Sequence, residues 1–384
     1  MRIIVAPDSF KGSLSAVAVA QAMKQGILTV FPDAEVIEAP IADGGEGTVE
    51  ALSTATGGQV IHHRVTGPLG EMVDAGWGIL GNGKTAVMEM AAASGLPLIP
   101  RDKRDPRRAT TLGTGELIQA ALDRGLRKII IGIGGSATND GGSGMAKALG
   151  IRFLDASGQE LPDGGSALAR LDRIDLSGAD PRLAATEILV ACDVDNPLCG
   201  PRGASAVYGP QKGATPDIVT ELDQALDRFA IVAQQATGRD AANLPGAGAA
   251  GGLGAGLLFF TNAQLRPGVE MILEAIRFDT LVRQADLVIT GEGNTDFQTA
   301  HGKAPVGVAK IAKQYGVPVV CLSGGLGTGC DAVLAQGIDG LMSIVPGPIA
   351  LEECLRQAPE LLAAATARLC RLLAVGANIP VLRN

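Results

Sequence analysis

Two glycine-rich segments of this chain also carry carboxylates, and each directly follows a short apolar run. The first spans 132–142 with the sequence GIGGSATNDGG, and the second spans 291–296 with the sequence GEGNTD. Glycine lets backbone N–H groups approach phosphate oxygens, and a helix N-terminus adds a positive dipole. Asp and Glu side chains can hold the Mg²⁺ that neutralises a nucleotide's charge. Together the segments predict a site for a metal ion and a phosphorylated ligand.

Lysines in glycine-containing turns fit the same chemistry. Lys11, Lys212 and Lys303 each lie beside a glycine. A lysine ammonium can act as a point charge for phosphate, although most lysines are simply solvated. Lys11 has further support because it follows the apolar run 3–6, at the end of a predicted strand. For His301, two residues before the last of these lysines, a role near phosphate and a capping or packing role both stay open.

Carboxylates recur in glycine-rich turns along the chain. Such turns are often only turns, because Asp and Asn hydrogen-bond their own backbone. Their repetition along the chain instead favours a shared role in metal binding and acid–base catalysis. Phosphoryl transfer asks for these functions: positioning, charge neutralisation and a group that accepts the acceptor hydroxyl's proton. The carboxylates concerned are Asp43 with Glu46, Asp140, Asp193 with Asp195, and Glu292 with Asp296.

The elements that must position these residues alternate between apolar runs and helical periodicity. Runs at 3–6, 128–131 and 287–290 predict strands, each followed by a polar segment and then by a helical pattern. This alternation is typical of βαβ units in a parallel sheet. Ser13 is the expected N-cap of the first helix. Ligands of open α/β sheets bind at the carboxyl ends of the strands, where the polar segments fall.

Two stretches depart from this pattern and predict a second, mixed α/β domain inserted into the first. The stretch around 60–105 contains hairpin-like alternation, and an Ala/Gly-rich run at 246–256 is either a flexible linker or a glycine-lined wall of a ligand cleft. The expected division places 1–59, 106–150 and 265–384 in a Rossmann-like domain, and 60–105 and 151–264 in the inserted domain.

One segment, 78–85, matches the P-loop pattern of nucleotide-binding proteins. A P-loop needs a buried strand before it and a helix after it. Here Asn82 and Gly83 lie between two alternating segments, which predicts a hairpin turn. The P-loop interpretation is therefore rejected.

The dinucleotide-binding fingerprint is a stronger rival. Gly132, Gly134 and Ala137 match its spacing after a predicted strand, and Asp155 lies where a ribose-binding acid is expected. This pattern would make the protein an NAD-dependent oxidoreductase. Against it, Asp140 puts a carboxylate where the pyrophosphate would sit, which favours a metal-bridged phosphate.

Composition sets broader limits. With 384 residues and 46% apolar content, the chain can bury a large core and is expected to form two domains. A net charge of −8 argues against a nucleic-acid partner. Six cysteines without a C-x-x-C pair and three histidines argue against zinc and disulfide frameworks. The first apolar run is too short for a signal peptide and no stretch approaches a membrane span, so a cytoplasmic protein without a membrane partner is expected.

In order along the chain, a series of motifs resembles those of the bacterial type-2 glycerate kinase family, nearly from end to end. They are APDSFKG at 6–12, ADGGEGT at 42–48, the segment 132–142, ACDVDNPL at 191–198, YGPQKGA at 208–214, and TGEG at 290–293 with Asp296, Gln298, Gly302 and Lys303. The resemblance implies ATP- and Mg²⁺-dependent phosphorylation of D-glycerate to 2-phospho-D-glycerate. It also implies a Rossmann-like (flavodoxin-like) domain, an inserted α/β domain and an active-site cleft between them.

The residues quoted above then divide into expected roles. We expect Asp193 to be the catalytic base and Lys11 to neutralise the transferring group. On the glycerate side we expect Ser9, Asp43, Glu46, Asn196 and Lys212. At the nucleotide phosphates we expect Gly134, Gly135, Ser136, Thr138, Asn139 and Lys303, and as Mg²⁺ ligands, directly or through water, Asp140, Glu292 and Asp296.

Two positions depart from the family's last motif, which usually has arginine and then an aliphatic residue. Here Asn294 and Thr295 stand in those places. Asparagine cannot replace a bidentate charged clamp on phosphate or carboxylate, so activity or substrate choice could differ. A catalytically idle sensor of nucleotide or glycerate therefore stays open as a third hypothesis.

Overall fold

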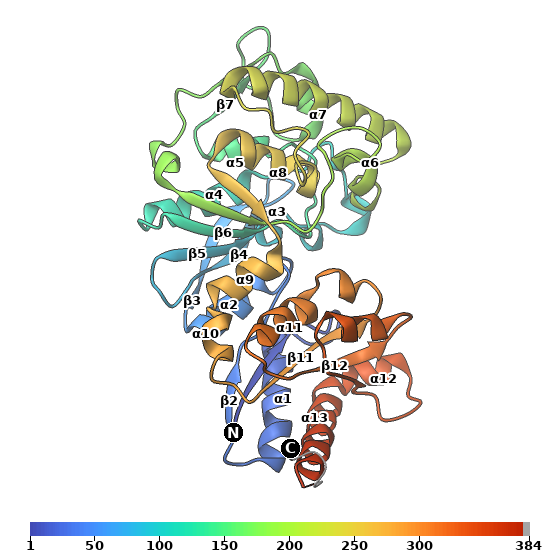
Figure 1. Ribbon diagram of the computed structural model, residues 1–384. Helices are drawn as coiled ribbons and strands as arrows, with labels where there is room; N and C mark the ends of the chain where they lie inside the picture. The colour runs from blue at the N-terminus through green and yellow to red at the C-terminus, as the bar shows by residue number, and fades with distance from the viewer. Residues whose placement is uncertain (379–384) are drawn as a thin grey trace. The chain divides into compact units, whose positions relative to one another are not determined.

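The computed structural model describes residues 1–378, which divide into two compact units of mixed α/β type (Figure 1). Unit 1 contains Met1–Asp43, Glu50–Gly57 and the chain from Val269 onward. Unit 2 contains Gly44–Val49 and Gly58–Gly268. Within residues 1–378, no helix combines the length and apolar character that a membrane crossing requires.

Unit 1 is built on a five-stranded, all-parallel sheet with the order β13-β12-β11-β1-β2. Counted in chain order within this sheet, the strand order is 2-1-3-4-5. Its strands are β1 (Arg2–Pro7), β2 (Glu35–Glu38), β11 (Leu287–Thr295), β12 (Val319–Leu326) and β13 (Gly340–Ser343). Helices wholly or mostly in this unit are α1 (Ala16–Val30), α2 (Thr48–Thr56), α9 (Gly268–Ala275), α10 (Phe278–Val282), α11 (Ala304–Gln314), α12 (Leu351–Arg356) and α13 (Ala358–Gly376).

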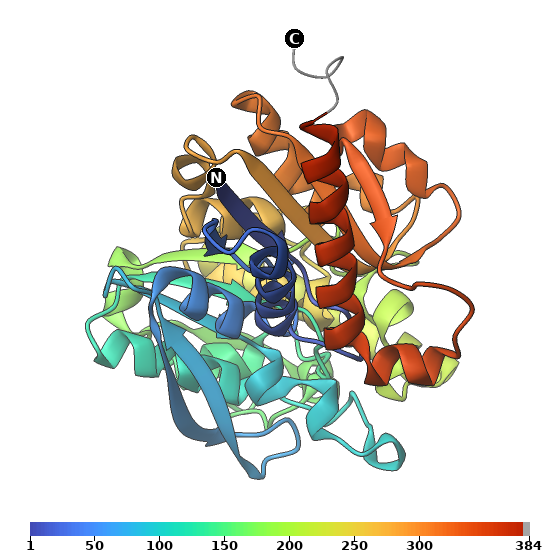
Figure 2. The same ribbon diagram turned by 90° about the horizontal axis from the view of Figure 1, so that it is seen from below.

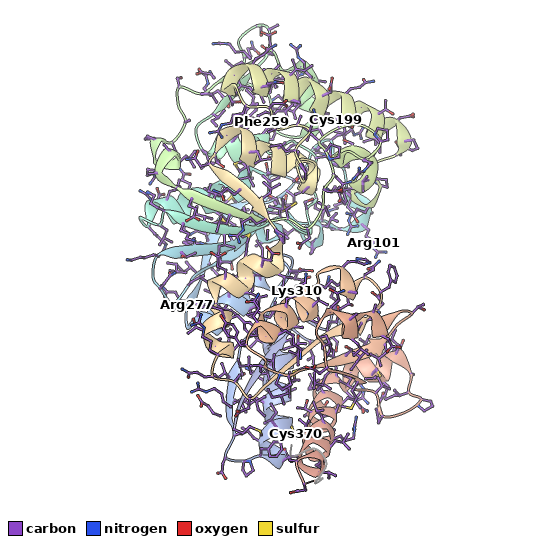
Figure 3. All side chains as sticks on the ribbon, in the orientation of Figure 1. Arg101, Cys199, Phe259, Arg277, Lys310 and Cys370 are labelled. Atoms are coloured by element: carbon purple, nitrogen blue, oxygen red, sulfur yellow. The ribbon has the colours of Figure 1, made fainter. Side chains whose placement is uncertain are left out.

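The core of unit 1 lies between its sheet and the helices α1 and α13, which lie side by side in Figures 1 and 2. Ile3 and Val5 of β1 share this core with Met23 of α1 and with Cys370 of α13, which is labelled in Figure 3. A Cβ atom at Gly26 would come 2.3 Å from a backbone oxygen of α13, so only glycine permits this helix packing. The buried helix pair fixes one face of the sheet whose strand ends carry the candidate site.

Unit 2 is built on a six-stranded mixed sheet with the order β10-β9-β6-β5-β4-β3. Neighbours from β5 to β10 are parallel, while β3, β4 and β5 are antiparallel. These strands are β3 (Gln59–Thr66), β4 (Met72–Ile79), β5 (Thr85–Glu89), β6 (Lys128–Gly132), β9 (Glu187–Ala191) and β10 (Ala263–Arg266); β7 (Arg152–Leu154) and β8 (Arg173–Asp175) form a separate pair. The helices are α3 (Ala91–Ser94), α4 (Leu112–Asp123), α5 (Ser143–Ala148), α6 (Ala204–Tyr208), α7 (Pro216–Thr237) and α8 (Ala249–Phe260).

Aromatic packing holds the helical layer of unit 2 together. Phe259 of α8, labelled in Figure 3, meets Phe229 of α7 edge to face, with ring centroids 5.8 Å apart. Both rings are buried in a cluster that also contains Phe153 of β7. Edge-to-face pairs add to the stabilisation that burial supplies.

The hairpin predicted across 78–85 is confirmed. β4 pairs antiparallel with β5, and Trp77 lies opposite Met88. The Asn82 side chain accepts hydrogen bonds from the Lys84 and Thr85 N–H groups at 2.9 and 3.0 Å, which closes the turn. The P-loop pattern in this segment therefore has no P-loop structure.

Residues 106–150 fall in unit 2, whereas the sequence analysis placed them with residues 1–59. The reason is strand pairing, since β6 lies between β5 and β9 in the sheet of unit 2. An apolar run predicts a strand without specifying which sheet it joins.

Two local predictions also differ from the structure. The N-cap of α1 is Ser15, whose side chain accepts from the Ala18 N–H, while Ser13 donates its N–H to Phe10 within the preceding turn. The glycine segment 291–296 is not a loop after the strand, because β11 continues to Thr295. Serine at both 13 and 15 made the cap ambiguous from sequence, and only the backbone hydrogen bonds decide it.

The Ala/Gly-rich run 246–256 is packed inside unit 2, so the linker interpretation is wrong. Its residues are buried and continue into α8, with left-handed backbone at 250–252. A Cβ atom at Gly251 would lie 1.9 Å from the Thr138 carbonyl oxygen, and the Gly251 carbonyl accepts from the Gly141 N–H at 3.0 Å. Glycine is required here for close approach to the segment 132–142.

Replacing Gly251 by Ala is expected to destabilise the protein by roughly 2–5 kcal/mol, because a forced positive φ adds to a steric clash. Gly238 is the matched control, since it has a similar φ of 70° but nothing within 4 Å of a built Cβ. Gly238→Ala should lower the free energy of unfolding by only about 1–2 kcal/mol. Urea denaturation of both variants checks this, and equal costs would contradict the packing role.

Candidate active site

In unit 1, charged side chains gather where β1 ends, beside the last residues of β11. This strand-end cluster consists of Asp8, Lys11, Asp43, Glu292 and Lys303. The Lys11 Nζ lies 3.7 Å from Asp43 Oδ2, and the Lys303 Nζ lies 4.0 Å from Glu292 Oε2. Two cations and three carboxylates thus occupy the carboxyl edge of a parallel sheet, which is where such sheets bind ligands.

Backbone contacts position the cluster. The Asp8 N–H donates to the Gly291 carbonyl at 2.8 Å, which joins the residue after β1 to β11. A Cβ atom at Gly293 would lie 3.3 Å from the Lys11 backbone nitrogen, so glycine lets the turn that carries Lys11 approach the strand closely. The order of the strands in the sheet therefore brings the two sequence motifs together.

Asp8 belongs to the motif at 6–12, but it is not among the residues with an expected role. Burial, together with the nearby Asp43 and Glu292 carboxylates, raises the pKa of the Asp8 carboxyl to about 6. The Ser9 N–H, which donates to Asp8 Oδ1 at 2.6 Å, and the Lys11 ammonium oppose that rise. A carboxyl with a pKa near neutrality suits acid–base work or charge exchange with a ligand. The available signal was its place as the first ionisable residue after the strand.

Glu292 and Asp296, the expected metal ligands of unit 1, have different surroundings. Glu292 is 7% exposed, and its Oε1 accepts from the hydroxyls of Thr295 and Thr299. Burial raises the pKa of Glu292, while these hydroxyls and Lys303 lower it. Asp296 is more accessible and accepts from the Asn294 side-chain amide at 3.2 Å. The unit thus holds one buried carboxylate and one half-buried carboxylate, which also accepts from the Gln298 N–H.

In unit 2, the segment 132–142, here named the glycine loop, follows the carboxyl end of β6. Glu89 at the end of β5 and Ala191 at the end of β9 are the register neighbours of Gly132. Asp193 follows β9, so Glu89, the glycine loop and Asp193 lie at the same edge of this sheet. Glu89 also accepts from the Val49 N–H at 2.8 Å, which holds the segment 44–49 against this edge.

The glycine loop is exposed only at its second and third glycines. Gly134 and Gly135 are exposed, whereas the residues from Ser136 to Gly142 are buried. Lys212 is 1% exposed, and its Nζ donates to Ser136 Oγ at 2.8 Å and to the Thr138 carbonyl at 2.7 Å. Burial lowers the pKa of Lys212 to about 7, against the opposing effect of the Asp140 charge. This lysine contacts the loop itself and holds its shape.

Each buried polar side chain of the glycine loop has at least one protein partner, but Asn139 Oδ1 is buried without a hydrogen bond. Asp140 accepts from the N–H and hydroxyl of Thr111, both at 2.8 Å, and from the Gly142 and Gly144 N–H groups. Burial raises the pKa of Asp140, and these donors oppose that rise. Asn139 donates to Ser205 Oγ at 2.9 Å. The expected contacts of Thr138 and Asn139 with nucleotide, and of Asp140 with metal, stay predictions.

The remaining predicted site residues of unit 2 vary in accessibility. Asp193 and Glu46 are exposed, and Asp193 Oδ1 accepts from the Gly268 N–H at 3.0 Å. The Asn196 amide is already hydrogen-bonded, because its Oδ1 accepts from the Tyr208 hydroxyl at 2.7 Å and its Nδ2 donates to a backbone carbonyl. Asp193 and Glu46 are therefore accessible to a ligand, while the Asn196 side chain is held by its own unit.

The donor set limits how a metal ion could bind. Among residues 1–378, no group of three His, Cys, Asp or Glu side chains is placed to hold a metal ion. Mg²⁺ is usually bound through one or two carboxylates together with substrate phosphates, rather than in an all-protein cage. The Oε2 atom of Glu292 and the half-buried carboxylate of Asp296 fit that mode of binding.

Comparison with known proteins places this geometry in a family. The model of the "Glycerate kinase family" matches residues 3–374. The chain belongs to the glycerate kinase family. It is 57% identical to "Glycerate kinase" of Bacillus subtilis (strain 168) over 94% of each chain, and 51% identical to "Glycerate 2-kinase" of Escherichia coli (strain K12) over 98% of this chain and 99% of the relative. A crystal structure assigned to glycerate kinase 2 of Salmonella typhimurium LT2 has a TM-score of 0.90 at 50% identity, covering 99% of this chain and 100% of that one.

Membership of the glycerate kinase family leaves the nicotinamide interpretation without support. The structure gives a physical reason as well. Asp155 lies in an exposed turn after β7, where it accepts from the Ser157 and Gln159 N–H groups. Since β7 pairs with β8 in a sheet separate from that of β6, Asp155 does not follow the neighbouring strand that a dinucleotide fingerprint requires.

Proposed function

We propose that this protein is an ATP-dependent glycerate kinase that phosphorylates D-glycerate to 2-phospho-D-glycerate. The observation that carries the proposal is its near end-to-end similarity to proteins named glycerate kinase and glycerate 2-kinase. The chemistry at both sheet edges supports it, because phosphoryl transfer depends mainly on positioning and charge neutralisation. The substrate is then a small organic acid, and no nucleic-acid or membrane partner is proposed.

For the fold, we propose a flavodoxin-like domain with an inserted α/β domain. The strand order 2-1-3-4-5 in unit 1 is the order of flavodoxin-like sheets. Along the chain, most of unit 2 comes between the segments of unit 1. Both features support the proposal.

In unit 2, nucleotide phosphates would bind the glycine loop at Gly134, Gly135 and Ser136. Two of these residues are exposed, and backbone N–H groups of glycine can approach phosphate closely. Thr138, Asn139 and Asp140 would hold the loop in shape from beneath. Asp193 is the proposed base, because it is an accessible carboxylate at the adjacent strand end. Glu46 and Asn196 are proposed on the glycerate side. Lys212, which the resemblance also places there, is buried against the glycine loop and is proposed to act by holding that loop.

In unit 1, Lys11 would neutralise the transferring phosphoryl group, and Lys303 would contact nucleotide phosphate. The Lys11 side chain is 82% exposed, so it can reach a ligand. Glu292 and Asp296 would hold a Mg²⁺ ion that arrives with the nucleotide, and that ion would supply further charge neutralisation. Ser9 and Asp43 are proposed contacts for glycerate.

The test is release of ADP from ATP and Mg²⁺ with and without D-glycerate, with the product position assigned by phosphorus NMR. We expect ADP only when D-glycerate is present, and a 2-phosphate product. Asn294→Arg should be measured beside the native chain, because it restores the guanidinium usual in the family. Activity confined to that variant would show that Asn294 disables an intact site. Absence of glycerate-dependent ADP release from both proteins would contradict the kinase proposal. A 3-phosphate product would contradict the proposed position of phosphorylation.

A further inference from the structure

The two carboxylate oxygens of Glu292 have different surroundings. Oε1 accepts from the Thr299 hydroxyl at 2.6 Å and from the Thr295 hydroxyl at 3.0 Å. Oε2 lies 4.0 Å from the Lys303 Nζ. Both threonines are fully buried. One oxygen is therefore held inside the protein, while the other lies on the side of the cluster lysine.

A second layer of hydroxyl and thiol groups supports the first. The Ser323 Oγ of β12 lies 2.7 Å from Thr295 Oγ1, and the Cys321 Sγ lies 3.4 Å from Ser323 Oγ. An ionised carboxylate only accepts hydrogen bonds, so the single Thr295 proton is donated to Glu292. Ser323 must then donate to Thr295, and the Cys321 thiol can donate to Ser323. The chain of donors is directed at Oε1, and such chains strengthen each bond in them.

Three separate segments converge to build this arrangement. Glu292 and Thr295 belong to β11, Ser323 is the register partner of Glu292 on β12, and Thr299 belongs to the short 3₁₀ helix Thr299–His301. Thr295 stands where the motif resemblance leads to the expectation of an aliphatic residue. An aliphatic side chain could bury its bulk there but could not donate a hydrogen bond. The threonine at this position therefore makes a hydrogen bond to Glu292 that an aliphatic residue could not make.

We propose that Thr295 is a positioning residue that, with Thr299 and Ser323, fixes the Glu292 carboxylate so that Oε2 faces the magnesium nucleotide. The inference rests on the proposed function for the identity of that ligand. A carboxylate that is already held in its binding orientation binds a metal ion more tightly, because its side chain loses less conformational freedom on binding. Thr295 contributes through Glu292 and need not touch the ligand.

The test compares Thr295→Val with Thr290→Val. Thr290 is a fully buried threonine on the same strand, and its hydroxyl donates to the Ala6 carbonyl at 2.7 Å rather than to a carboxylate. Valine replaces threonine with nearly the same shape, so both variants lose one buried hydroxyl. We expect Thr295→Val to weaken Mg·ADP binding by about tenfold in calorimetry and to raise the Mg²⁺ activation constant similarly. Thr290→Val should change the Mg·ADP affinity and the Mg²⁺ activation constant by less than about twofold. Thr295→Ser keeps the hydroxyl and should bind Mg·ADP as the native protein does.

The outcomes separate this inference from the proposed function. Equal behaviour of the two valine variants, or failure of a folded Thr295→Ser variant to restore binding, would overturn the positioning role. A different outcome is that the native protein binds Mg·ADP but releases no ADP in response to glycerate, while Thr295→Val loses Mg·ADP binding. That outcome would uphold the positioning role and overturn the kinase proposal. Near-ultraviolet circular dichroism of each variant shows whether it is folded. Calorimetry without glycerate keeps the binding readout independent of turnover.

Discussion

Replacing Asp8 by Asn is expected to lower kcat by at least about a hundredfold and, at the same time, to stabilise the folded protein above pH 6. The carboxylate lies with Lys11 and Glu292 in the strand-end cluster. If Asp8 exchanges a proton or charge with the ligand, an amide cannot replace it, and such groups typically contribute factors of 10²–10⁴. The stability gain has a separate cause, which is the cost of burying the charge.

The sign of this pH effect follows from the raised pKa. The Asp8 carboxyl has a pKa of about 6 in the folded protein against an ordinary value of 3.8, so between these values the folded state binds more protons than the unfolded state. The contribution of the Asp8 carboxyl to the free energy of unfolding is fully present below pH 3.8 and is lost as the pH rises through 6. Asn carries no such charge, and the gain of Asp8→Asn at pH 7.5 should therefore reach about 1–3 kcal/mol and vanish near pH 4.

Urea denaturation at several pH values, in chelator so that no metal contributes, measures the stability effect. Asp33→Asn is the control, because Asp33 is an exposed carboxylate of unit 1 outside the strand-end cluster. That variant should show neither the pH-dependent gain nor the loss of kcat. An Asp8→Asn variant that is less stable than the native protein at pH 7.5 would contradict the buried-charge explanation.

Replacing Lys212 by Met should have the second large effect, by loosening the glycine loop. The Lys212 Nζ donates to Ser136 Oγ and to the Thr138 carbonyl, and both acceptors would be left buried without this donor. We expect kcat/KM for ATP to fall by about a hundredfold, because small displacements of a phosphate-binding loop carry costs of this order. Steady-state kinetics at saturating glycerate measure it.

The stability of the native protein should also depend on Lys212 in alkaline solution. Burial lowers the pKa of Lys212 from 10.5 to about 7, so between these values the unfolded state binds more protons than the folded state. Native stability therefore rises with pH from 7 toward 10.5, by up to about 1.4 kcal/mol per pH unit, and Lys212→Met should lack this rise. Urea denaturation at pH 6.5, 8 and 9.5 follows the slope.

Lys147→Met is the control for both measurements on Lys212. Lys147 is a largely buried lysine of unit 2 that donates to the Leu161 carbonyl at 2.6 Å and pairs with Asp163. It bonds to no part of the glycine loop, so kcat/KM for ATP should change by less than about threefold. If Lys147→Met lowers kcat/KM as much as Lys212→Met does, the effect is general destabilisation rather than loss of the loop contact.

Local chemistry was readable directly from the sequence. The strands at 3–6, 128–131 and 287–290 are correct because short apolar runs bounded by turn residues are strong local signals. The Asn82-Gly83 hairpin is correct for a similar reason, since the turn's own side chain closes it. These signals act within a few residues of one another. They were also sufficient to show the family motifs and hence the class of reaction.

Non-local pairing decided the rest. Residues 106–150 belong to unit 2 because β6 found its partners in β5 and β9, and no residue near β6 encodes that choice. Lys212 and Ser136 are far apart in sequence, so neither the buried contact between them nor the lowered pKa could be inferred from turn chemistry. Asp8 acquires its raised pKa only when β1 lies beside β11. Burial and electrostatic coupling arise from packing of distant segments, and only the tertiary structure specifies that packing.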